Sequence, residues 1–191
     1  MRAGVMHFQA LGQGCEIPLL PVVNAMSRPA RAGRCHTGVA ISGKSISIAT
    51  VFAYRNTLTL NEAKLAVLEF DLACQAAFHE AIDDIQTWIT RKRIKSLLLR
   101  GLPSGGGEMA ARGSAYRLET MLQLTRGVSI RTMAPQVLTR WFGAYDVSLP
   151  PTGHLLTGAQ RRPMERALVA AAYQAMLKGD LTVDGGACGR A

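Results

Sequence analysis

The sequence HTGVAISGKSISIATV, residues 36–51, contains two short apolar runs separated by a turn. The first run, residues 37–41, ends at Ser42-Gly43, two residues that favour turns. The second run, residues 45–51, alternates between apolar and polar side chains with the period of a half-buried strand. We therefore predict a β-hairpin here, followed by a third strand at residues 56–60.

Beyond residue 60, helical and strand-like patterns alternate. Apolar spacings of three and four residues predict helices, whereas the compact apolar run at residues 94–99 predicts a buried strand. In chain order, we expect a helix over 62–93, a strand over 94–99, a helix over 109–125, a strand over 128–130, a helix opened by Pro135 and a last helix over 163–178. This order predicts an α/β domain whose mixed sheet is flanked by helices.

The composition indicates one domain with flexible ends. Residues 1–35 scatter Gly, Pro and Arg without any period, so we expect a flexible N-terminal extension, with Met26 as an alternative start. The domain is expected over residues 36–178, and the Gly-rich residues 179–191 are expected to form a flexible tail.

Cysteine usage and hydropathy favour the cytoplasm. Cys15, Cys35, Cys74 and Cys188 are widely spaced and form no CxxC pair, which argues against a zinc finger or a disulfide framework. No apolar run is long enough to span a bilayer, so we expect no membrane contact.

The net charge of +9 is concentrated in one part of the chain. Residues 91–166 carry thirteen basic and four acidic side chains, whereas residues 36–90 carry three basic and six acidic ones. A field of this sign attracts polyanions, of which nucleic acid is the most common. A basic surface that serves only solubility is the alternative interpretation.

Four segments carry a family resemblance. They are TGVAISG at residues 37–43, LLRGLP at 98–103 with YRLETMLQL at 116–124, VSIRTMAP at 128–135, and residues 165–176. In order and spacing they resemble an uncharacterised bacterial family, domain-of-unknown-function family 3010, which is related to the Holliday-junction resolvase RuvC. The resemblance implies an RNase H-like (RuvC-like) fold, whose strand-strand-strand-helix-strand-helix-strand-helix order agrees with the predicted elements.

The resemblance also implies where a metal site would lie. RuvC-like nucleases hold two Mg²⁺ ions with one acid on the first strand and another on the strand after the first helix. This sequence has Ala40 and Gly101 at those places, so both are degenerate catalytic positions. Only Glu165, near the start of the last helix, is acidic where a third ligand would sit. One carboxylate does not hold two metal ions.

Glu119 and Glu108 are the other acidic candidates in this half of the chain. As relocated ligands they would complete a site with Glu165, which makes Glu165 and Glu119 the catalytic candidates. The competing interpretation makes Glu108 a charge at a helix N-terminus and Glu119 a surface residue paired with an arginine. We expect Mg²⁺ as a cofactor only if such a site is active, and otherwise no cofactor.

Three functions are compatible with these features. The first, which we favour, is a non-catalytic RuvC-like domain that binds nucleic acid, or a nucleoprotein partner, through a basic face. Its expected contacts are Arg91, Lys92, Arg93, Arg100, Arg112, Arg117, Arg126, Arg131, Arg140, Arg161 and Arg162. The second is a metal-dependent, resolvase-like nuclease with relocated carboxylates, and the third is a protein-interaction module. A homodimer is left open in all three.

Overall fold

A computed structural model describes residues 33–70, 75–102, 109–152 and 156–183, all within a unit that spans residues 32–191. Residues 1–32 of the expected extension lie outside the described residues. In chain order the elements are β1 (Arg34–Ser42), β2 (Ser45–Tyr54), β3 (Thr57–Leu60), the short 3-10 helix η1 (Glu62–Lys64), β4 (Ala66–Glu69), α1 (Gln75–Arg91), β5 (Ser96–Arg100), α2 (Met109–Leu124), β6 (Ser129–Met133), α3 (Pro135–Ala144) and α4 (Gly158–Leu177). None of the described helices has the length and apolar character needed to cross a membrane.

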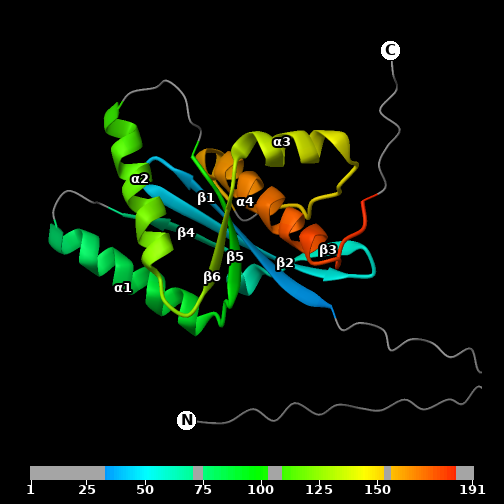
Figure 1. The fold of residues 1–191 in the computed structure, drawn as a ribbon, viewed down its shortest axis with the longest axis horizontal. Coiled ribbons are helices and arrows are strands. Elements are labelled where there is room, and N and C mark those ends of the chain that lie inside the picture. Colours follow the sequence, from blue (N-terminus) through cyan, green and yellow to red (C-terminus); the bar gives the residue numbers. More distant parts are fainter. Residues whose placement is uncertain (1–32, 71–74, 103–108, 153–155, 184–191) are drawn as a thin grey trace, which may run out of the picture. The chain divides into compact units, whose positions relative to one another are not determined.

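The strands form one mixed sheet in the order β3-β2-β1-β5-β6, with β4 paired to β2 (Figure 1). β1 and β2 pair antiparallel along their length, as the predicted hairpin requires, and β3 continues the meander. β5 and β6 run parallel to β1 and β5 respectively, so the chain crosses over through α1 and α2 between them. The predicted α/β class, with a mixed sheet flanked by helices, is confirmed.

The helix predicted over 62–93 is wrong in its first part. Residues Glu62–Lys64 form η1, Ala66–Glu69 form β4, and α1 begins at Gln75. The cause is a long-range pairing. β3 covers only the second half of β2, and β4 pairs with the first half, which places Leu68 opposite Ile46. The spacing of apolar residues within a short stretch of sequence gives no information about pairing with a distant strand, so it predicted a helix here.

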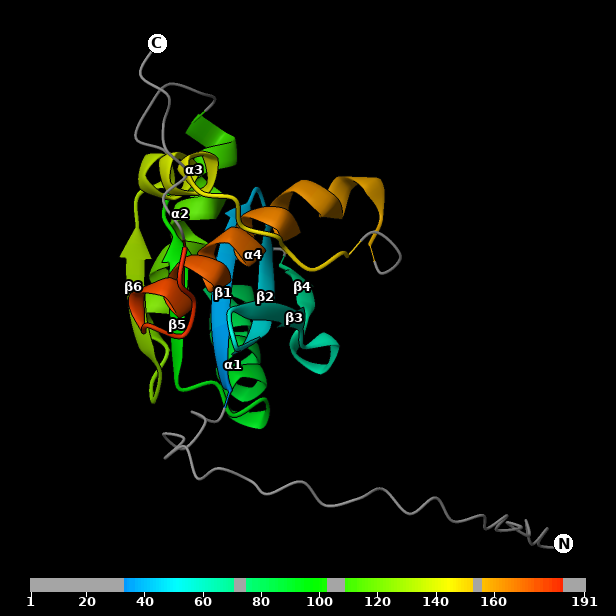
Figure 2. The ribbon, with the colours of Figure 1, turned by 90° about the vertical axis from the view of Figure 1, so that its right-hand side faces the viewer.

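Helices cover both faces of the sheet. α1 and α2 pack on one face, and α4 with α3 packs on the other; in Figure 2, α4 lies in front of the strands and α1 behind them. Side chains alternate along each strand, so Val39 faces α1 and α2 while Ala40 faces α4. This alternation decides which candidate site residues are able to meet.

α4 approaches β1 closely because the residues between them are small. A Cβ atom on Gly38 would overlap the carbonyl oxygen of Ala167 and the backbone nitrogen of Ala171. Ala167, Ala170 and Ala171 are themselves fully buried. The contact fixes the middle of α4 against the middle of β1.

A buried amide ties α4 to the two central strands. The backbone N–H of Thr37 on β1 donates a hydrogen bond to Gln174 Oε1 at 2.9 Å. The Nε2 group of Gln174 lies 3.4 Å from Ser96 Oγ on β5, to which it donates. Gln174 therefore satisfies a backbone donor that α4 covers.

Replacing Gln174 by methionine is expected to lower the free energy of unfolding by about 1–3 kcal/mol, because the buried Thr37 N–H loses its acceptor. Urea denaturation followed by circular dichroism measures the change. Gln123→Met, at an exposed position on α2, is the matched control and should change the free energy by less than about 0.5 kcal/mol. Equal stability of the two variants would show that the amide is dispensable.

The folded domain extends past its predicted end at residue 178. His36 Nε2 lies 3.1 Å from Asp180 Oδ2, and Leu181 is buried in the apolar cluster under α4. Burial lowers the pKa of His36, and the Asp180 carboxylate opposes part of that shift. These contacts give residues 180 and 181 a packed position where we expected a flexible tail.

The stability of the domain is expected to fall as the pH drops below about 6.5. In this range His36 takes up a proton in the unfolded chain, whereas the folded imidazole, with its lowered pKa, stays neutral down to a lower pH. Urea denaturation at a series of pH values between about 7.5 and 5.5 measures the loss. His36→Gln should show a smaller loss over this range, and an unchanged pH dependence would contradict the assignment.

Candidate functional site

Strand pairing shows where Ala40 lies, the position at which the family resemblance would place the first catalytic acid. Ala40 lies opposite Ser47 on β2 and in register with Arg100 on β5. Ala40 packs in the cluster under α4, and Leu98, two residues before Arg100, packs against Ala170 of the same helix. Side-chain alternation therefore directs Arg100 to the face of Ala40. The Ser47 hydroxyl in this row is buried and has no hydrogen-bond partner among the described residues.

Gly101, the second position expected to be degenerate, belongs to the other face. A Cβ atom on Gly101 would lie 3.1 Å from Thr132 Cγ2 and 4.0 Å from Glu119 Oε1, on the side of α2. Ala40 and Gly101 therefore do not face a common site. The residue of β5 that lies beside Ala40 is Arg100, because a step of one residue along a strand reverses the face.

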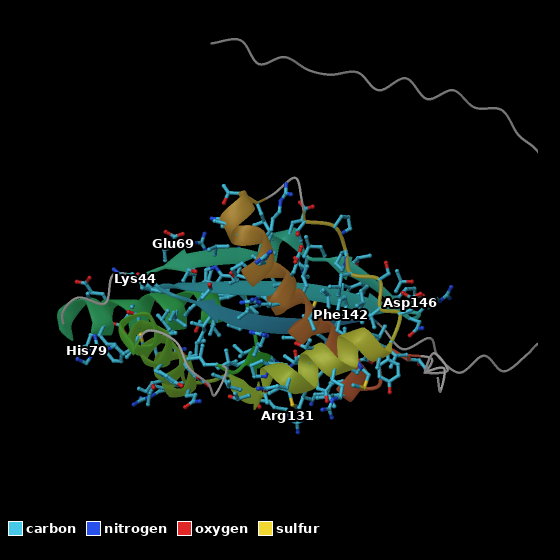
Figure 3. All side chains as sticks on the ribbon, turned by 90° about the horizontal axis from the view of Figure 1, so that it is seen from above. Lys44, Glu69, His79, Arg131, Phe142 and Asp146 are labelled. Atoms are coloured by element: carbon cyan, nitrogen blue, oxygen red, sulfur yellow. The ribbon has the colours of Figure 1, made fainter. Side chains whose placement is uncertain are left out.

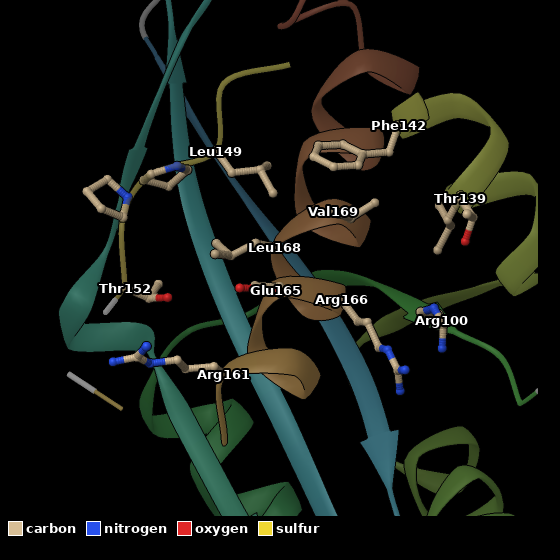
Figure 4. A pocket seen from close by; sticks show the side chains of 13 residues that line it. Arg100, Thr139, Phe142, Leu149, Thr152, Arg161, Glu165, Arg166, Leu168 and Val169 are labelled. Carbon is tan, nitrogen blue, oxygen red and sulfur yellow. The ribbon is translucent and has the colours of Figure 1, made fainter. Parts of the chain in front are cut away.

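A cleft of about 680 Å³ opens beside Arg100 (Figure 4). Residues of α3, of the segment 149–152 and of the first half of α4 form its walls. Phe142 of α3 contributes an aromatic ring to the cleft and is partly exposed. In Figure 4, the Phe142 ring extends from α3 toward α4.

The charged residues of this cleft are Arg100, Arg161, Glu165 and Arg166. Arg166 is directed to the side of α4 on which Arg100 lies, whereas Glu165 is directed toward Thr152 (Figure 4). The cleft therefore contains three guanidinium groups and one carboxylate. We call this site the arginine cleft.

The electrostatics of the arginine cleft favour an anion. Burial lowers the pKa of Arg100, and the positive charge of Arg166 lowers it further. A guanidinium group nevertheless keeps its proton at neutral pH, so the two like charges remain close together. A phosphate or carboxylate bound between them would remove the repulsion and supply charge-assisted hydrogen bonds.

The two carboxylates expected as relocated metal ligands lie on helices that pack on opposite faces of the sheet. Glu165 is exposed on α4. Glu119 is half-buried on α2; burial raises its pKa, against a hydrogen bond donated by the backbone N–H of Leu102. Within the described ranges, no three His, Cys, Asp or Glu side chains group closely enough to hold a metal ion. Glu108 lies outside those ranges.

The basic residues expected to form one face divide between the two ends of the parallel strands. Arg91 is the last residue of α1, Lys92 and Arg93 lie between α1 and β5, and Arg126 lies between α2 and β6. Gln86 joins the two segments, because its Oε1 accepts a hydrogen bond from the Arg126 N–H at 2.7 Å. These residues lie at the N-terminal ends of β5 and β6, whereas the arginine cleft lies at the C-terminal end of β5.

The other expected contacts are spread over the surface. Arg117 on α2, Arg131 on β6 (Figure 3), Arg140 on α3 and Arg162 on α4 are all exposed. The side chain of Arg112 lies outside the described residues. Sequence reasoning misses Arg166 as a contact. The spacing of Arg162 and Arg166, one helical turn apart beside Glu165, is the signal that points to it.

Comparisons with known proteins identify the fold. The chain is similar to Thermus thermophilus RuvC solved in complex with a Holliday junction substrate, with 10% identity and a TM-score of 0.54, over 79% of this chain and 100% of that one. A second structure of Thermus thermophilus RuvC has 10% identity and a TM-score of 0.49 over the same shares. The human cytomegalovirus terminase nuclease domain, soaked with Mn, has 13% identity and a TM-score of 0.36 over 81% of this chain and 89% of that one.

The fold is therefore RuvC-like (RNase H-like), as predicted. No protein-family model and no curated protein match the chain. The resemblance to the bacterial family of unknown function accordingly stays a prediction.

Proposed function

We propose that this RuvC-like domain binds nucleic acid through the arginine cleft and does not cleave it. The observation that carries the proposal is the sheet row of Ser47, Ala40 and Arg100, in which an arginine stands in register beside the position where the family resemblance would place an acid. This row therefore holds a positive charge and no carboxylate.

Phosphate is the group that this cleft fits best. Arginine presents a planar fork of donors that matches phosphate oxygens, and it tolerates partial burial better than lysine. The positive charge of Arg166 lowers the pKa of Arg100, and both side chains lie on the same side of α4 (Figure 4), so we propose that one phosphate contacts both. The Phe142 ring in the same cleft offers a surface for a base or sugar.

The residues present do not fit the pair of Mg²⁺ ions that the resemblance implies. Mg²⁺ requires carboxylate oxygens, and the row across the sheet supplies none. Arg100 and Arg166 would also repel a divalent cation. We therefore derive no metal-dependent step.

Binding is tested by fluorescence anisotropy with labelled duplex, single-stranded and four-way-junction DNA. The junction is included because the similar RuvC structure was solved with such a substrate. We expect an affinity that falls linearly with salt concentration on logarithmic axes, because phosphate contacts release counterions. An absence of binding at about 50 mM salt would contradict the proposal and favour the protein-interaction module.

The same DNA samples test the alternative of a metal-dependent nuclease. Incubation with Mn²⁺ or Mg²⁺ should leave the junction intact. Cleavage by the wild type that is lost in Glu165→Gln would establish relocated carboxylates and overturn the non-catalytic assignment.

A further inference from the structure

We infer that Phe52 and Tyr54 on β2 form a stacking platform for unpaired bases of a single-stranded nucleic acid. The inference rests on the proposed nucleic-acid function but concerns a different surface. Phe52 pairs with Cys35 at the start of β1, and Tyr54 pairs with Thr57 of β3, whereas Arg100 is in register with Ala40 near the end of β1. The closing experiment separates the two sites.

The two rings form an ordered aromatic surface. Phe52 and Tyr54 are two residues apart on one strand, so both face the same side of the sheet. Their ring centroids are 6.5 Å apart, with an angle of 20° between the ring planes. Each residue is 38% exposed, a high value for a large aromatic side chain on a strand.

Neither ring belongs to the core of the described domain. On the same face of β2, Ile46 and Ile48 are buried under α1 and α2. Thr50 comes next and bonds to Thr37 through their hydroxyl groups at 2.9 Å. Beyond this polar pair the face carries Phe52 and Tyr54, which are members of no buried cluster among the described residues.

Positive charge borders the rings. The Arg55 guanidinium lies 5.1 Å from the centroid of the Tyr54 ring. Arg93 and Lys95 precede β5, which runs parallel to β1, so they lie at the same end of the sheet. An aromatic surface beside cations is the combination that single-strand-binding proteins use.

The position of Arg55 is costly for the backbone. Arg55 and Asn56 form the two-residue turn between β2 and β3, with φ values of 47° and 65°. Both angles lie in the left-handed region, where asparagine and glycine are favoured and a long side chain is not. Asparagine at position 55 would suit the turn better, so an arginine there costs the fold some stability. The contact of its guanidinium with the Tyr54 ring offsets part of this cost, and a phosphate bound beside the ring would offset more.

The spacing of the two rings and the nearby positive charge indicate that the ligand is a single-stranded nucleic acid. Successive bases on one strand of a duplex are separated by about 3.4 Å, whereas the two ring centroids are 6.5 Å apart. Neighbouring bases that each cover one ring would have to lie farther apart than they do in a regular duplex, and an unpaired strand allows this without distortion of base pairs. The bordering arginines match its phosphates, and base stacking on aromatic rings tolerates any sequence.

The test is anisotropy of the full chain with fluorescein-labelled oligo-dT and oligo-U of about 16 nucleotides. Phe52→Val with Tyr54→Thr keeps residues that favour strands but removes both rings. We expect affinity for at least one oligonucleotide to fall about a hundredfold, roughly tenfold for each stacked base. The salt dependence should be unchanged, because no charge is removed. The relative affinities of dT and U distinguish DNA from RNA.

Two matched variants control for nonspecific effects. Tyr116→Ala removes an aromatic residue that is 49% exposed on α2 and should retain wild-type affinity. Phe52→Tyr with Tyr54→Phe preserves both rings and should also bind normally. Arg55→Asn should weaken binding about tenfold without loss of thermal stability, since the turn is relieved.

The outcomes are separable from those of the proposed function. Wild-type binding that the loss of both rings leaves unchanged would overturn the platform while the arginine cleft stands. Equal losses in the ring variant and in Tyr116→Ala would also overturn it, as would a dimer in the wild type that the ring variant abolishes. If the wild type binds duplex and junction but neither oligonucleotide, only the platform fails. If it binds no nucleic acid, both fail.

Discussion

Gly38→Ala is expected to destabilise the domain by about 3 kcal/mol or more, because the new methyl group would overlap the backbone of α4. The atoms it would meet belong to Ala167 and Ala171, and a helix backbone does not rotate away as a flexible side chain does. α4 must move off β1 as a body, which opens the cluster of alanines beneath it. Thermal and urea denaturation measure the loss.

The same substitution at Gly113 is the matched control. Gly113 lies on α2, and a Cβ atom there would meet nothing within 4 Å. Gly113→Ala should therefore stabilise the domain by about 0.5–1 kcal/mol, the usual gain of alanine over glycine in a helix. Destabilisation of similar size at both positions would show that the α4–β1 contact is not as close as described.

The double variant Arg100→Met with Arg166→Met is expected to weaken nucleic-acid binding about a hundredfold at fixed salt. Two phosphate contacts would be lost, which should also reduce the slope of log affinity against log salt by about 1.8 for duplex DNA. Methionine keeps the apolar stem of the arginine side chain in the cleft. Because the desolvated like charges disappear, stability should not fall, so loss of binding without loss of folding identifies a binding site.

Lys64→Met with Lys178→Met removes the same net charge at residues that do not line the cleft. Lys64 belongs to η1, and Lys178 follows α4. If binding depends on the arginine cleft, this pair should cost less than about threefold in affinity, the share expected from net charge alone. Equal effects of the two double variants would mean that only net charge matters, and would refute the arginine cleft as the binding site.

Strands and helices that depend on the pattern of neighbouring apolar and polar residues could be predicted from the sequence. The hairpin of residues 36–51 and the buried strand before Arg100 are confirmed, because alternation and a compact apolar run are properties of neighbouring residues. β4 was not predictable, because its four residues become a strand only by completing the edge of β2. Local spacing in that stretch favours a helix.

The sequence predicts which residue types belong to the candidate site, but it does not predict how these residues are arranged in space. Ala40, Glu165 and an excess of arginine are visible in the sequence. The face on which each residue lies depends on strand register, and one residue separates Gly101, on the α2 side, from Arg100, beside Ala40. The separation of the basic residues between the two ends of the sheet likewise follows from the parallel pairing of β1, β5 and β6.

Calorimetric titration of Mn²⁺ into the full chain tests most directly whether the arginine cleft binds an anion rather than a metal ion. We predict no stoichiometric binding of Mn²⁺ by a sample that binds the DNA junction, because Arg100 and Arg166 oppose a cation and the sheet row supplies no carboxylate. Stoichiometric Mn²⁺ binding that Glu165→Gln abolishes would contradict this account and assign the cleft to a metal.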